Sequence, residues 1–177
     1  MAAPFSNIHP IQEKSHQLHV IIDTPKGSRN KFSFDEDLQV FKLKHVLPEG
    51  AVFPFDFGFL PNTIAEDGDP LDVMVLMDAP AFAGCLIEAR AIGVIEAEQT
   101  DSTGKTSRND RLLAVSVNSR LHQDHKNISD LSAVFLDEIE HFFRSYNQLR
   151  QIDFKVLARS GPDKALALVR EGIRKAR

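Results

Sequence analysis

Residues 66–72 read EDGDPLD and place four carboxylates in seven positions, with no basic residue among them. Carboxylates this close repel each other unless a cation lies between them. Asp67 and Asp69 share one face of an extended chain, whereas Asp72 has the opposite parity. A bend at Pro70 would bring the three side chains to one point. Oxygen ligands without nearby His or Cys favour Mg²⁺, Mn²⁺ or Ca²⁺ over zinc, so the stretch predicts a divalent-cation site.

A solvated turn is the alternative interpretation, because Asp, Gly and Pro are residues that turns prefer. The apolar run LDVMVLM at 71–77 overlaps the stretch, so Asp72 lies inside a predicted strand rather than in a loop. Basic residues opposite a bound metal would complete a site for a phosphate ester or anhydride, since they neutralise the oxygens that the metal leaves free. The basic candidates are Lys26, Arg29, Lys31, Lys42, Lys44, Arg108 and Arg111.

The elements that must position these side chains are mostly short strands. Apolar runs bounded by Gly, Pro, Asp and Asn predict strands at 18–22, 31–34, 38–42, 71–77, 85–98, 112–117 and 153–158. Helical spacing predicts a helix from about Ser129 to Leu149, capped by Ser129 or Asp130. A second helix begins at 160–162, with proline in its first turn. This order predicts an α+β fold, a closed or nearly closed β-barrel with two C-terminal helices packed outside.

The composition is that of an ordinary globular protein, and its 177 residues predict one domain over 1–177. A formal net charge of −4 disfavours a general nucleic-acid binder with a basic face. Cys85 is the only cysteine, which excludes an intrachain disulfide and favours a reducing compartment. No apolar window reaches the length of a signal peptide core or a membrane span, so we expect a cytoplasmic protein with no membrane partner.

The motif DGDPLDV, preceded by FPFDFGFLPNT and followed by GCLIEARAIGV, resembles the soluble family I inorganic pyrophosphatases. The resemblance extends from HVIIDTPKGSRNKFSF through HFFRSYNQL to DFKVL and covers most of the chain, whose length suits the bacterial members. It implies a five-stranded barrel of the oligonucleotide-binding type with helices outside. It also implies hydrolysis of pyrophosphate to two phosphates with two or more Mg²⁺ ions, and a homo-oligomer that is a hexamer in bacteria.

The resemblance further implies roles for individual residues. Asp67 and Asp72 match the metal-binding aspartates of the motif, and Asp69 matches the one that helps deprotonate the attacking water. Asp69 is also a candidate metal ligand. Asp23 falls at the place of a glutamate in the active-site cavity. The remaining candidates are Lys31, Tyr146, Arg111, Lys44 and Phe57 for the substrate, and Glu98, Asp101 and Asp110 for the metals.

The sequence departs from the family pattern mainly at the phosphate contacts. A cavity glutamate, an arginine, two tyrosines and a lysine are replaced by Ser33, His45, Phe53, Phe57 and Asn147. Two alternatives therefore stay open, a metal-dependent hydrolase of another phosphoanhydride or nucleotide and a non-catalytic barrel that binds metal or phosphate. An oligonucleotide-binding module is disfavoured, because the cavity is acidic and one tyrosine without tryptophan offers little surface for base stacking.

Overall fold

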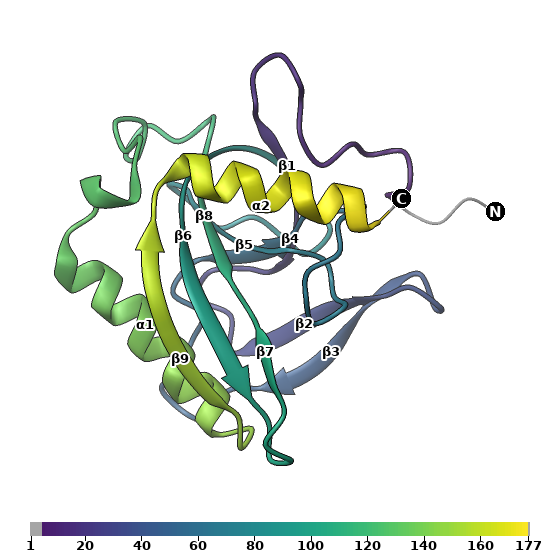
Figure 1. Cartoon of the computed structure of the whole chain (residues 1–177), viewed down its shortest axis with the longest axis vertical. Coiled ribbons are helices and arrows are strands. Elements are labelled where there is room, and N and C mark those ends of the chain that lie inside the picture. Colours follow the sequence, from purple (N-terminus) through teal and green to yellow (C-terminus); the bar gives the residue numbers. More distant parts are fainter. Residues whose placement is uncertain (1–4, 177) are drawn as a thin grey trace.

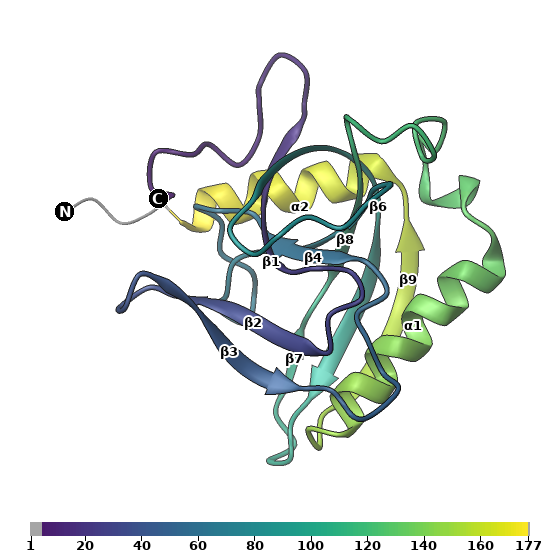
Figure 2. The same cartoon turned by 180° about the vertical axis from the view of Figure 1, so that it is seen from behind.

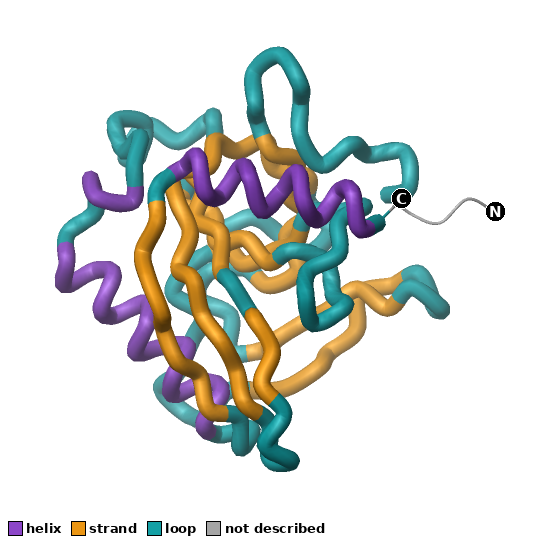
Figure 3. Tube along the Cα trace, in the orientation of Figure 1, coloured by secondary structure: helices purple, strands orange, loops and turns teal. Residues whose placement is uncertain are grey.

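The computed structural model describes residues 5–176, which form one large sheet, a hairpin and two α-helices (Figure 1 and Figure 3). The strands are β1 (Leu18–Thr24), β2 (Asn30–Asp35), β3 (Val40–Val46), β4 (Asp56–Phe59), β5 (Asp72–Leu76), β6 (Leu86–Thr100), β7 (Thr106–Arg108), β8 (Arg111–Ser116) and β9 (Asp153–Ser160). The helices are α1 (Ala133–Gln148) and α2 (Pro162–Lys175), and a 3-10 turn at Ile128–Asp130 precedes α1. Neither described helix has the length and apolar character needed to cross a membrane.

Five strands pair in a ring, in which β1 contacts β4, β4 contacts β5, β5 contacts β8, β8 contacts β6, and β6 returns to β1. The β5–β8 pair is parallel and the others are antiparallel. Bulges interrupt the β1–β4 and β6–β8 pairs, so the ring is an irregular mixed sheet rather than a regular closed barrel. The predicted α+β class, with strands of the oligonucleotide-binding type and two helices outside, is confirmed.

The β2–β3 pair is a separate antiparallel hairpin that follows β1 directly in the chain. Figure 2 shows it as a layer of its own beside the ring. Strands β7 and β9 both extend β6 beyond the ring. The hairpin and the ring together provide two walls that face each other.

Both faces of the central strands are buried. On β5, Val73 and Val75 pack in the apolar cluster that contains Ala165 and Val169 of α2. The alternate residues of β5, including Met74, pack in the other cluster, to which α1 contributes Leu136, Ile139 and Phe143. A strand buried on both faces needs apolar residues at every position, which explains the unbroken apolar run after the acidic stretch.

Strands β4 and β7 were not predicted from the sequence. β4 is four residues long and contains Gly58, and glycine weakens the signal of a strand. A Cβ atom at position 58 would lie 2.3 Å from the carbonyl oxygen of Ile21, so the close approach of β1 and β4 requires glycine here. β7 is a polar strand of three residues and carries no apolar pattern.

The start of the first predicted helix was wrong by a few residues. Ser132 caps α1, and its hydroxyl accepts a hydrogen bond from the backbone N–H of Phe135 at 3.2 Å. Ser129 and Asp130 belong instead to the preceding 3-10 turn. The second helix begins as predicted, with Gly161 as N-cap and Pro162 at the first helical position.

A buried carboxylate ties α1 to the sheet. The side chain of Glu140 is 7% exposed and accepts a hydrogen bond from Nε of Arg159 on β9 at 2.7 Å. Arg144, one turn further along α1, donates to the same carboxylate at 3.2 Å. This contact sets the position of α1, whose last turns reach the cavity described below.

We expect Glu140→Ala to lower the free energy of unfolding by about 1.5–3 kcal/mol, because it removes charge-assisted hydrogen bonds and leaves Arg159 without this partner. Glu138→Ala is the matched control, since Glu138 lies on the same helix and is exposed. Its effect should stay within about 0.5 kcal/mol. Denaturant unfolding of both variants measures the difference, and equal effects would contradict the role given to Glu140.

Candidate active site

A cavity of about 340 Å³ lies between the β2–β3 hairpin and the ring. Its walls combine residues from strands of both units with residues from the acidic stretch and from α1. Nine of the site residues predicted from the sequence line it, namely Asp23, Lys31, Lys44, Phe57, Asp67, Asp69, Asp72, Arg111 and Tyr146. Segments far apart in the sequence thus meet at one place.

The acidic stretch forms a tight turn before β5. The backbone N–H of Ala65 donates to the carbonyl of Asp69 at 2.8 Å, and Gly68 adopts φ +91°, which favours glycine. Asp67 Oδ1 accepts a hydrogen bond from the backbone N–H of Asp69 at 3.2 Å. Asp72 follows as the first residue of β5. The chain turns at residues 66–69, just before Pro70 where the bend was predicted, and all three carboxylates line the cavity.

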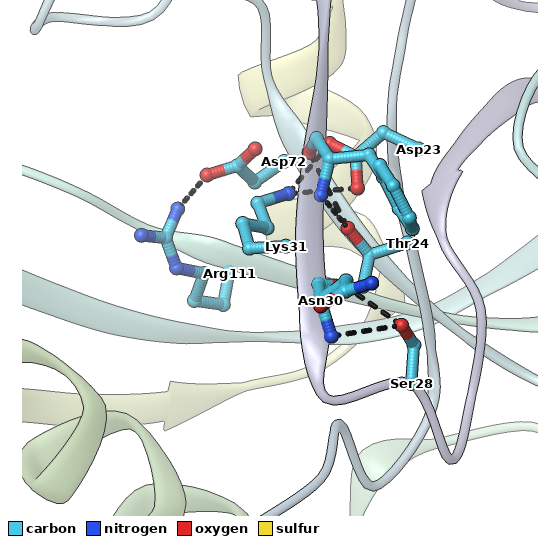
Figure 4. Close-up of polar contacts among 8 residues, drawn as sticks. Asp23, Thr24, Ser28, Asn30, Lys31, Asp72 and Arg111 are labelled. Carbon is cyan, nitrogen blue, oxygen red and sulfur yellow. Dashed lines mark hydrogen bonds and ion pairs between the residues drawn. The ribbon is translucent and has the colours of Figure 1, made fainter. Parts of the chain in front are cut away.

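These carboxylates crowd each other. Loss of solvation raises the pKa of Asp67, and the negative charges of Asp69 and Asp72 raise it further. Arg111 on β8 forms an ion pair with Asp72 between Nη1 and Oδ2 (Figure 4). The arginine is 8% exposed, so the pair lies largely out of water.

A second ion pair lies beside the first. Nζ of Lys31 is 2.7 Å from both carboxylate oxygens of Asp23, as Figure 4 shows. Burial raises the pKa of Asp23 to about 6 and lowers the pKa of Lys31, and the attraction between the two charges opposes both changes. Nζ of Lys31 also lies 4.4 Å from the ring centroid of Phe57. The phenylalanine at this position therefore still packs against a cation through its ring.

The donor atoms fit a hard divalent cation. Within residues 5–176, no three His, Cys, Asp or Glu side chains converge as a preformed metal cage. Mg²⁺ does not require one, because it keeps several waters and binds through one or two carboxylates plus phosphate oxygens. Asp67, Asp69 and Asp72 can supply those carboxylates, provided that Asp72 exchanges Arg111 for the cation.

Two predicted metal ligands, Glu98 and Asp110, do not line the cavity. Glu98 pairs with Lys155 of β9, at 3.1 Å between Oε1 and Nζ. Asp110 Oδ1 accepts a hydrogen bond from the backbone N–H of Ala97 at 2.9 Å and pairs with Arg108 at 2.8 Å. Both carboxylates thus form ion pairs outside the cavity lining.

Asp101, the third candidate of that segment, also lies outside the cavity lining. Its carboxylate organises the turn between β6 and β7 and accepts hydrogen bonds from the backbone N–H groups of Thr103 and Lys105, at 2.8 and 3.1 Å.

The second acidic segment places amides in the cavity instead. Gln99 and Asn109 line it, although neither was predicted from the sequence as a site residue. The signal was present, because Asn109 is two residues before Arg111 and therefore shares its face of an extended chain. The same alternation places Asp110 on the opposite face. Further lining residues that were not assigned to the site include Glu36, Phe143 and Arg150.

Crowded carboxylates facing buried lysine and arginine define a class of site that can hold a cation together with an anionic phosphate compound. The sequence profile of the family described as Inorganic pyrophosphatase matches residues 20–177, and the chain belongs to this family.

Individual relatives agree with this assignment. The chain is 41% identical over 165 residues to an inorganic pyrophosphatase of Synechocystis, which covers 93% of this chain and 95% of the relative. It is 36% identical to an inorganic pyrophosphatase of Geobacillus stearothermophilus, over 88% of this chain and 92% of the relative. The crystal structure of inorganic pyrophosphatase from Thermus thermophilus superposes with a TM-score of 0.86 at 30% identity and covers 98% of this chain and 99% of that one.

The Asp23 pKa predicts how stability depends on pH. Because burial raises it from 3.8 to about 6, the folded state holds a proton between these pH values that the unfolded chain has released. This contribution to stability is complete below pH 3.8 and is lost as pH rises through about 6. In the presence of a chelator, the stability of the unaltered chain relative to Asp23→Asn should therefore fall between about pH 4 and 6. Denaturant unfolding across this range measures it, and a constant difference would contradict the assignment.

Proposed function

We propose that the chain hydrolyses inorganic pyrophosphate to two phosphates with Mg²⁺ as its cation. The observation that carries the proposal is the charge of the cavity wall. Five carboxylates face four cations, so the wall has a formal charge of −1 and by itself repels a phosphoanhydride. The carboxylates are Asp23, Glu36, Asp67, Asp69 and Asp72, and the cations are Lys31, Lys44, Arg111 and Arg150. Two Mg²⁺ ions would reverse the sign, and membership of the inorganic pyrophosphatase family supports this substrate.

Asp67, Asp69 and Asp72 are the residues that would hold the metal ions. A bound divalent cation supplies neutralisation of phosphate charge and lowers the pKa of a coordinated water. The carboxylate of Asp69 accepts the proton of the water that attacks phosphorus. The bridging P–O bond breaks, and its electron pair leaves with the second phosphate.

The basic residues of the cavity hold the phosphate oxygens. Lys31 and Arg111 are both buried, so their attraction for an anion is weakened little by solvent. They become available when their carboxylate partners turn to the cations. Burial raises the pKa of Tyr146, which keeps its hydroxyl protonated and able to donate a hydrogen bond. Lys44 and the ring of Phe57 complete this wall.

A second candidate function is hydrolysis of another phosphoanhydride. Gln99 and Asn109 favour it, because neutral amides stand in the cavity where the resemblance led us to expect carboxylates. Phosphate release from pyrophosphate, tripolyphosphate and ATP, compared at equal Mg²⁺, separates the two. Binding of these compounds without release would instead favour the non-catalytic alternative.

Residues 1–177 act as one domain in the cytoplasm, where a single cysteine stays reduced and where biosynthetic reactions produce pyrophosphate. Exposed apolar side chains, among them Phe82 and Leu121, are consistent with a homo-oligomer, for which the family resemblance suggests a hexamer.

Removal of the metal should abolish turnover. We expect no phosphate release in excess chelator and full recovery on adding Mg²⁺, because the wall alone does not neutralise a tetra-anionic substrate. Ca²⁺ should bind but support little turnover, since its looser coordination orients water and phosphate less strictly. Turnover that persists in chelator, or equal rates with the two ions, would refute the metal assignment.

Asp69→Asn should lower kcat by about 10²–10⁴-fold, because the amide does not accept the proton of the water. Asp67→Asn and Asp72→Asn should instead weaken metal binding, and part of their activity should return at high Mg²⁺. Glu66→Gln is the matched control, because Glu66 belongs to the same acidic stretch but does not line this cavity. Phosphate release measured against Mg²⁺ concentration distinguishes the variants. If Asp69→Asn recovers as its neighbours do, Asp69 acts only as a further metal ligand, and its assignment as the base is wrong.

A further inference from the structure

Two residues near the end of α1, Asn147 and Arg150, differ in where their side chains lie. Asn147 stands where the family resemblance has a phosphate-binding lysine. Its side chain is buried, at 1% exposure, and its Nδ2 donates to the carbonyl of Phe143 at 2.9 Å. It is therefore committed to its own helix and is not among the residues that line the cavity.

Arg150 lies three residues further on and does line the cavity. Its backbone N–H donates to the carbonyl of Asn147 at 2.9 Å, and the N–H of Ile152 donates to the same carbonyl at 3.0 Å. These bonds fix the turn that ends the helix. The guanidinium carbon of Arg150 lies 5.6 Å from the ring centroid of Tyr146, the predicted phosphate-binding tyrosine.

The charge of Arg150 is not committed to a carboxylate. Lys31 and Arg111 each form a salt bridge with an aspartate of the cavity, whereas none of the carboxylates in residues 5–176 forms one with Arg150. The positive charge of Arg150 nevertheless affects side chains at the cavity. After burial, the charge of Arg150 is the next cause that lowers the pKa of His45, and it opposes the burial that raises the pKa of Tyr146.

We propose that Arg150 binds the phosphoryl group on the Tyr146 side of the cavity and thereby replaces the lysine that is absent at position 147. The inference rests on the proposed function and names a further substrate-binding residue for it. A guanidinium offers two parallel donors to phosphate oxygens, which a lysine does not. In this role Arg150 holds the phosphoryl group before and during the reaction alike, so its loss raises KM more than it lowers kcat.

The chain contains its own probe for this test. Tyr146 is the only tyrosine and there is no tryptophan, so tyrosine fluorescence reports on this cavity alone. Methylenebisphosphonate, a diphosphate analogue that is not hydrolysed, can be titrated in the presence of Mg²⁺ while this fluorescence is recorded. The measurement gives a dissociation constant that does not depend on turnover.

Arg150→Gln should weaken binding of methylenebisphosphonate by about tenfold to a hundredfold, the loss expected for hydrogen bonds to a charged group. KM for pyrophosphate should rise by a similar factor, with kcat changed less than about threefold. Arg170→Gln is the matched control, because Arg170 is exposed on α2 and does not line this cavity. Its dissociation constant should stay within about twofold of the unaltered chain.

Arg150→Lys keeps the charge and loses the paired donors, so its affinity should be about threefold to tenfold weaker than that of the unaltered chain. This variant decides the case if the glutamine variant does not fold. Equal binding by the unaltered chain and the Arg150 variants overturns the inference and leaves the proposed function standing. If the unaltered chain neither binds the analogue nor releases phosphate from pyrophosphate, the proposed function is wrong and the inference falls with it.

Discussion

Repulsion among the cavity carboxylates is the constraint on which the site depends. Asp67, Asp69 and Asp72 lie close together, and Asp23 is buried nearby. Two ion pairs offset part of this repulsion, because Asp72 pairs with Arg111 and Asp23 pairs with Lys31. Buried charges of this kind are stable only while they are paired. A divalent cation on the carboxylates would release the two basic side chains, which would then need an anion as partner. A metal ion and a phosphate group would therefore balance the same set of charges together.

The fold maintains this pattern by fixing the two walls independently. The β1–β4 approach, which depends on Gly58, and the parallel β5–β8 pair place Asp72 beside Arg111. The hairpin that follows β1 brings Lys31 back onto Asp23. Apolar packing on both faces of the central strands makes these positions rigid, since a strand buried on both sides cannot slip in register without moving its whole core.

The substituted positions change how the cavity is charged more than how it is shaped. Phe53 and Phe57 keep aromatic rings at 6.0 Å centroid separation, and Phe53 lies 5.8 Å from Tyr146, so the apolar wall is continuous. Gln99 and Asn109 offer uncharged amide oxygens as ligands. These oxygens repel an incoming phosphate less than carboxylates would, and they attract a cation less strongly. In the proposed function, the acidic stretch before β5 would supply most of the binding to metal, and basic residues of β2, β3, β8 and the turn after α1 would bind phosphate.

The sequence alone predicts the turn in the acidic stretch, the strand after it and the start of α2. These features depend on turn residues and apolar runs that lie within a few positions of each other. The same local rules missed β4, whose glycine makes sense only when Ile21 of another strand lies against it. Tertiary structure alone decided which face of β6 and of the segment before β8 meets the cavity. For this reason Gln99 and Asn109 line the cavity, whereas Glu98 and Asp110 do not. It also decided that the Asn147 side chain bonds to its own helix while Arg150 lines the cavity. The physical reason is that a side chain's direction depends on strand pairing and helix packing over long sequence separations, whereas its chemistry depends on the residue itself.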